Sequence, residues 1–263
     1  MAEDVAPALL DAIRADFSSR LGGCQRAAQL LELIRQGAGT YQDANEYSKQ
    51  VGEALSEAFQ ANLSSAVLPD GRMYWNIADR VVRPLLEEDH GLVAAAAEQV
   101  QTSLNEAAGL GLQAQTVPLN ESRVTGILNR LSSAKQYDDI AWILGEPVVN
   151  FSQAIIDASI RRNVDFQGKS GLRPRVRRRA DPNCCPWCRA LAGSYSYPDV
   201  PDDVYRRHEN CRCDVTYTPG DGRTQNVWTR SWNDSPDVLA ARRNFTGLDT
   251  SPLSNRQRRP AWG

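Results

Sequence analysis

The chain has 263 residues, 41% of them hydrophobic and 24% charged, which is enough to bury a core as one large domain or two modest ones. Its formal net charge of −2 hides an asymmetry, since residues 1–165 carry 13 Lys/Arg against 22 Asp/Glu and residues 166–263 carry 17 against 10. No apolar stretch approaches the roughly 20 residues that span a bilayer, and the acidic start at Met1–Asp4 is unlike a secretory signal. We therefore expect no membrane segment and a reducing cytoplasm, with acidic and basic surfaces that can each meet a partner.

The first 165 residues are predicted to be helical almost throughout, without a sheet. Val51, Leu55 and Phe59 recur every four residues, which places them on one face of a helix. His90 lies in an acidic stretch that is typical of a solvated helix end. Pro84 is expected to bend or end one helix, and further helices are expected over 92–108, 136–144 and 148–162.

The character of the sequence changes near residue 165. The segment Arg173–Arg179 is expected to be extended, and Ser194–Tyr197 and Asp214–Tyr217 alternate as short strands do. The predicted fold class is therefore mainly α: a helical N-terminal region (1–165), a small α+β zinc-knuckle-like C-terminal module (166–225) and an extended tail (226–263). The tail is interpreted either as an arm that lies on another surface or as a frayed end.

Five of the six cysteines fall within residues 184–213, in two short motifs. The first motif reads Cys184-Cys185-Pro186-Trp187-Cys188, and the second, 19 residues later, reads His208-Glu209-Asn210-Cys211-Arg212-Cys213. A C-x-x-C turn can direct two sulfurs at one ion, and zinc prefers four such sulfur or nitrogen ligands in a tetrahedron. In a reducing compartment this clustering favours a structural zinc site that helps a small module to fold.

The candidate ligands outnumber the four that zinc needs. The preferred set is Cys185, Cys188 and Cys213 with either His208 or Cys211 as the fourth, so the choice between the last two stays open. Reduced thiols without metal and disulfides are the alternatives. A dithiol redox motif is also possible in principle, but the arginine-rich segment before it is judged unable to form the central buried strand that such enzymes have.

A run of arginines precedes the cysteines and could contact phosphates or an acidic partner by charge. The residues concerned are Arg173, Arg175, Arg177, Arg178 and Arg179. Aromatic residues of the kind that stack on bases do not alternate with them, so a solvated edge that faces the acidic half is the competing interpretation. The chain has only two histidines and no Gly-rich phosphate loop, and we predict that it is not an enzyme.

The cysteine motifs resemble the C-terminal signature of phage Mu F-like minor head proteins, in which a cysteine followed by L-x-G precedes H-x-N-C-R-C. The signature falls here on Cys188, Leu191, Gly193, His208, Asn210, Cys211, Arg212 and Cys213. The likeness covers about residues 172–227, and this chain departs from it at Glu209, where proline is common, and in the extra cysteine of the Cys184-Cys185 doublet.

The resemblance implies a minor capsid protein that takes part in phage head morphogenesis. Its expected partners are the portal or the major capsid protein, other copies in an oligomer and, through the arginines, packaged DNA. The expected location is the virion, and the host cytoplasm during assembly. A zinc-binding nucleic-acid module is the main alternative, and a thiol oxidoreductase is a weaker one.

Overall fold

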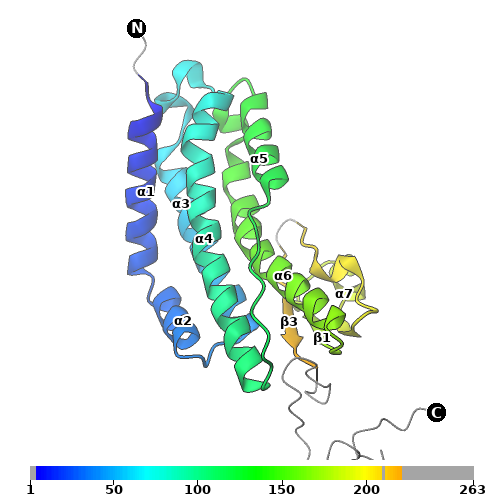
Figure 1. Ribbon diagram of the computed structural model, residues 1–263. Helices are drawn as coiled ribbons and strands as arrows, with labels where there is room; N and C mark the ends of the chain where they lie inside the picture. The colour runs from blue at the N-terminus through cyan, green and yellow to red at the C-terminus, as the bar shows by residue number, and fades with distance from the viewer. Residues whose placement is uncertain (1–3, 209–210, 221–263) are drawn as a thin grey trace, which may run out of the picture. The chain divides into compact units, whose positions relative to one another are not determined.

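The computed structural model describes residues 4–208 and 211–220, in which α-helices are followed by a small antiparallel sheet (Figure 1). The helices are α1 (Ala6–Gly23), α2 (Gln25–Arg35), α3 (Tyr41–Asn62), α4 (Trp75–Ala107), α5 (Glu121–Ser133), α6 (Glu146–Lys169) and α7 (Pro186–Ala190). The strands are β1 (Arg175–Arg179), β2 (Gly193–Ser196) and β3 (Asp214–Thr218). The predicted fold class, mainly helical with a small α+β module, is confirmed; the predicted tail over 226–263 lies outside the described residues.

Helix α3 lies at the centre of the helical region, where it contacts α1, α2, α4 and α6. Its start is fixed by a capping box, because the Thr40 side chain accepts from the Asp43 N–H while the Asp43 carboxylate accepts from the Thr40 N–H. The predicted apolar face is fully buried at Val51, Leu55 and Phe59. The long helices α1, α3, α4 and α6 consequently lie side by side (Figure 1).

Helices α3 and α6 approach each other closely at Gly52. A methyl group at this position would lie 2.8 Å from the Cα of Val149 and 2.6 Å from the Oγ of Ser152, both on α6. Glycine therefore allows the two backbones to meet, as small residues do at tight helix crossings.

Two helix boundaries differ from those predicted. Of the two outcomes expected at Pro84, a bend or an end, the end does not occur, because α4 continues through the proline from Trp75 to Ala107. Val81, Val82 and Leu85 are fully buried around the proline, and their packing offsets the backbone hydrogen bond that proline cannot make. The segment 136–144 forms two short 3-10 turns, Tyr137–Asp139 and Ala141–Leu144, rather than a helix.

The sheet has the strand order β2-β1-β3, with both pairings antiparallel. The arginine-rich segment is thus the central strand, contrary to expectation, but it is not a fully buried strand, because one of its faces is exposed. The physical reason is alternation: Val176 and Arg178 are buried on one face, whereas Arg175, Arg177 and Arg179 are exposed on the other. A strand of five residues can therefore carry four arginines and bury only one of them.

A buried hydrogen-bond network joins the sheet to the helices. The Tyr217 hydroxyl of β3 donates to Gln167 of α6, whose amide donates to Asn105 Oδ1 of α4 at 2.8 Å. Gln101 of α4 donates to the same Asn105 oxygen and accepts from Tyr41 of α3, both at 2.8 Å. Since satisfied buried networks specify one arrangement of their elements, the sheet and helices belong to one compact unit, Met1–Asp221. The boundary predicted at residue 165 falls inside α6.

Candidate metal centre

The first motif places two cysteines at the start of α7. Cys185 is the N-cap residue, and Pro186 occupies the first helical position, where its fixed backbone angle suits a helix start. The Cys188 N–H donates to the Cys185 Sγ over 3.4 Å, so both sulfurs lie on the same side of this turn. The C-x-x-C spacing therefore produces the local geometry that a metal site requires.

The second motif approaches the same place from the other side. The Cys211 N–H donates to the His208 carbonyl over 3.2 Å, which turns the chain before it enters β3. The His208 Nε2 lies 3.0 Å from the Cys188 Sγ and 3.2 Å from the Cys185 Sγ. The Cys188 and Cys211 sulfurs lie 3.7 Å apart. The two distant motifs therefore converge.

The candidate ligand atoms form two groups within 4.8 Å that share one residue. One group is Cys185, Cys188 and His208, and the other is Cys188, Cys211 and Cys213. All five residues singled out from the sequence are brought together, and this Cys/His cluster could hold a metal ion. The combination of Cys185, Cys188 and Cys213 preferred from the sequence spans both groups. Neither group includes Cys184.

The cluster is buried on the side of the second group and open on the other. Cys188, Cys211 and Cys213 are at most 1% exposed, whereas Cys185 and His208 are partly exposed. The backbone N–H of Cys188 lowers the pKa of the Cys185 thiol, and burial raises the pKa of the Cys188 thiol to about 12. Burial thus favours the protonated thiol at Cys188.

Arg178 is the buried cation of the site, and the sequence did not reveal its role. Its side chain is 2% exposed and donates to the Cys188 Sγ over 3.4 Å and to the Cys211 Sγ over 3.7 Å. It also donates to the backbone carbonyls of Val204 and Arg206. A guanidinium in this position lowers the pKa of the Cys188 thiol and so opposes part of the effect of burial. Arg178 is therefore not part of the exposed contact surface in which it was predicted.

A second buried arginine anchors the motif to the helices. Arg207, directly before His208, forms an ion pair with Asp157 of α6, and the two side chains are 2% and 1% exposed. Its guanidinium also donates to Asn45 Oδ1 of α3 and to the Cys213 carbonyl, each at 2.9 Å. The cysteine motif is thus held against α3 and α6 by charge-assisted hydrogen bonds. Sequence reasoning missed both partners of this pair.

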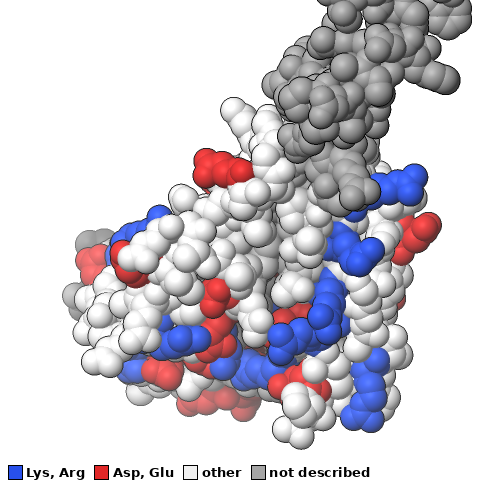
Figure 2. All heavy atoms as spheres, turned by 90° about the horizontal axis from the view of Figure 1, so that it is seen from below, with Lys and Arg blue, Asp and Glu red and all other residues white. Residues whose placement is uncertain are grey.

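The other predicted arginine contacts lie on the surface. Arg175, Arg177 and Arg179 lie on the exposed face of β1, and Arg173, which precedes that strand, is exposed. Arg179 donates to the side chain of Gln42 over 3.3 Å. Seen from below, Lys and Arg side chains gather in a nearly continuous band on one part of the surface (Figure 2).

None of the described helices is both long and apolar enough to cross a membrane. Comparisons with protein-family models, with curated proteins and with solved structures found no match to this chain.

Proposed function

We propose that the Cys/His cluster binds one structural zinc ion. The observation that carries this proposal is the convergence of the C-x-x-C turn and the His208–Cys213 segment into two groups that share Cys188. Sulfur and imidazole nitrogen are the ligands that zinc takes in structural sites. Cys188 belongs to both groups, so it is the residue through which the two groups can share one ion.

The proposed ligand set is Cys188 and His208 with two of the three cysteines Cys185, Cys211 and Cys213. Two sulfurs bound at about 2.3 Å in a tetrahedron lie about 3.8 Å apart, and a sulfur and a nitrogen lie about 3.5 Å apart. The Cys188–Cys211 separation of 3.7 Å matches the first value, and the two sulfur–nitrogen separations from His208, 3.0 and 3.2 Å, are slightly short of the second. The fifth residue of the cluster then lines the site as a thiol.

Four protein ligands leave no open position for a substrate or an activated water, so the proposed role is structural and non-enzymatic. Few large aliphatic residues surround the cluster, and the small group of buried residues at its centre consists of cysteines. Bound metal would supply folding free energy that such a group lacks. Zinc would thereby fix the second motif, and Arg207 with it, against the helices.

Chelation combined with cysteine variants tests the zinc proposal. Purified protein is expected to hold about one zinc per chain and to lose thermal stability when EDTA removes it. Cys188→Ser should abolish zinc retention, whereas Cys24→Ser, which changes a cysteine outside the cluster, should retain it. Zinc-free protein with an unchanged melting temperature in EDTA would overturn the proposal.

We further propose that the chain is a phage minor head protein that contacts the portal or the major capsid protein. The support is the order of its parts: a helical region first, then a compact Cys/His module whose residues match the signature of the Mu F-like family. Mass spectrometry of purified particles tests this. The protein should be found in heads that have been washed in high salt, and its recovery only from the soluble lysate would contradict the proposal.

The exposed face of β1 favours a second activity, contact with nucleic acid. On this face Arg175 lies between Ser196 and Thr218, and Arg177 lies between Ser194 and Thr216. Neither guanidinium forms an ion pair within the part of the chain that the structure describes. Free guanidinium groups flanked by hydroxyls suit phosphate oxygens.

Salt dependence measures this contact. The logarithm of the DNA-binding constant falls as the logarithm of the salt concentration rises. If both arginines bind phosphates of duplex DNA, the double variant Arg175→Gln/Arg177→Gln should make this negative slope less steep by about 1.8. Arg130→Gln, an exposed arginine on α5, is the matched control and should leave the slope unchanged. An unchanged slope in the double variant would exclude this face as the DNA contact.

A further inference from the structure

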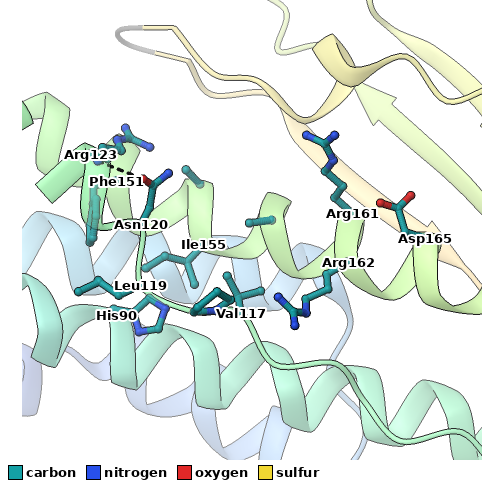
Figure 3. A pocket seen from close by; sticks show the side chains of 13 residues that line it. His90, Val117, Leu119, Asn120, Arg123, Phe151, Ile155, Arg161, Arg162 and Asp165 are labelled. Atoms are coloured by element: carbon teal, nitrogen blue, oxygen red, sulfur yellow. Dashed lines mark hydrogen bonds between the residues drawn. The ribbon is translucent and has the colours of Figure 1, made fainter.

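A cleft of about 380 Å³ runs along one side of α6, away from the cysteines (Figure 3). Its other walls come from α4, from the segment 110–120 that has no regular secondary structure, and from the start of α5. This volume lies within the range of small-molecule sites in proteins. Neither the zinc proposal nor the arginine face of β1 uses it.

The floor of the cleft is apolar because one stripe of α6 has no helix over it. Phe151, Ile155 and Ala158 recur at four- and three-residue spacing and so share a face of α6. Val117 and Leu119 of the extended segment lie opposite them. An extended chain covers a helix face less completely than a second helix would, which leaves the hollow.

The wall made by the extended segment is held in place by side chains of the helices. Asn163 of α6 accepts from the Gln115 N–H at 2.8 Å and donates to the Gln115 carbonyl at 3.1 Å. Asn105 of α4 donates to the Leu112 carbonyl at 2.9 Å. Because these buried amides replace the hydrogen bonds of a helix or sheet, the cleft is formed before any ligand arrives.

An arginine side chain lies at each end of the apolar floor of the cleft. Arg123 lies at one end, with its guanidinium 5.6 Å from the Phe151 ring centroid, and Arg162 extends from the other end toward the middle of the cleft (Figure 3). Within the described residues neither guanidinium forms an ion pair or a hydrogen bond with a carboxylate. Arg161, by contrast, points away and pairs with Asp202 at 2.8 Å.

Two further polar groups lie in the cleft. His90 projects into it from the interior of α4, which corrects its interpretation as part of a solvated helix end. Its Nε2 atom is buried and has no hydrogen-bond partner among the described residues. Asp165 at the Arg162 end is the carboxylate among the lining residues, so the cations remain in excess. A buried nitrogen without a partner is costly unless a ligand reaches it.

We propose that this cleft is a binding site for a small organic anion with an apolar body, such as a medium-chain carboxylate. The apolar stripe of α6 would take the body, while Arg123 or Arg162 would bind the carboxylate. An uncharged apolar ligand would leave the guanidinium groups unsatisfied, and a cation would be repelled by them.

Calorimetric titration with decanoate, acetate and decylamine tests the ligand class. Decanoate should bind at one saturable site per chain, and both acetate, which lacks the apolar body, and decylamine, which has the opposite charge, should bind at least about tenfold more weakly. Binding of decylamine as tight as that of decanoate, or no saturable decanoate binding, would overturn the proposal.

Variants locate the site. Ala158→Phe should fill the floor and abolish decanoate binding, and Arg123→Gln/Arg162→Gln should weaken it about tenfold or more. Arg130→Gln, on the same helix as Arg123 but outside the cleft, is the matched control and should bind as the parent does. If the arginine variant keeps the melting curve and the decanoate affinity of the parent, the cleft is not the site.

Discussion

The buried pair of Arg207 and Asp157 gives the sharpest test of how the cysteine motif is joined to the helices. Replacing Asp157 by Ala leaves the Arg207 guanidinium buried without its counter-charge, although its bonds to Asn45 and to the Cys213 carbonyl remain. Removing one partner of a buried ion pair typically costs about 3–5 kcal/mol. For a chain of this size such a loss lowers the melting temperature by roughly 10 °C.

Urea denaturation followed by circular dichroism measures this loss. The matched control is Asp202→Ala, which breaks the Arg161–Asp202 pair, whose side chains are 48% and 70% exposed. Because water screens exposed pairs, this control should lose about 0–1 kcal/mol. The Asp157→Leu/Arg207→Met double variant should be less destabilised than the sum of its single variants. A loss in Asp157→Ala no larger than that in the control would show that the buried ion pair does not hold the cysteine motif against the helices.

Three further predictions concern the helical core and the metal cluster. Burial raises the pKa of Asp89 to about 7, against about 3.9 in the unfolded chain, so wild-type stability should fall as pH rises between these values. In urea unfolding, the stability of Asp89→Asn relative to wild type should therefore rise by roughly 3 kcal/mol between pH 5 and pH 8. Gly52→Ala should cost about 1–3 kcal/mol in the same assay, because its methyl group would meet the Val149 backbone. Arg178→Met should weaken zinc retention about 10- to 100-fold in a chelator competition, since it removes the donor to Cys188.

Much of the fold follows from local patterns in the sequence. The four-residue recurrence of Val51, Leu55 and Phe59 predicted the central helix, and the spacing within the cysteine motifs predicted their convergence. The helix and the C-x-x-C turn each depend on residues that are near one another in the chain. Local rules did not predict that α4 continues through Pro84, because packing against other helices maintains that helix. They also did not predict the 3-10 turns in the segment 136–144, because no local sequence pattern there distinguishes such turns from a helix.

The supporting residues of the cluster could not be predicted because their partners are distant in sequence. Asp157 and Arg207 are separated by 50 positions, and no local pattern links them. One signal was available: Asp157 is a charged residue on the buried side of α6, between Ile156 and Ile160, and a buried charge implies a partner. The alternation of β1 could likewise have separated Arg178 from its exposed neighbours, had the segment been assigned as a strand.

X-ray absorption spectroscopy at the zinc edge of the purified protein tests whether the Cys/His cluster holds zinc as a structural ion. We expect about one zinc per chain with three sulfur neighbours at about 2.3 Å and one nitrogen at about 2.0–2.1 Å, and with no bound water. A sample without zinc, or a zinc with oxygen neighbours and an open position, would contradict a structural Cys/His site.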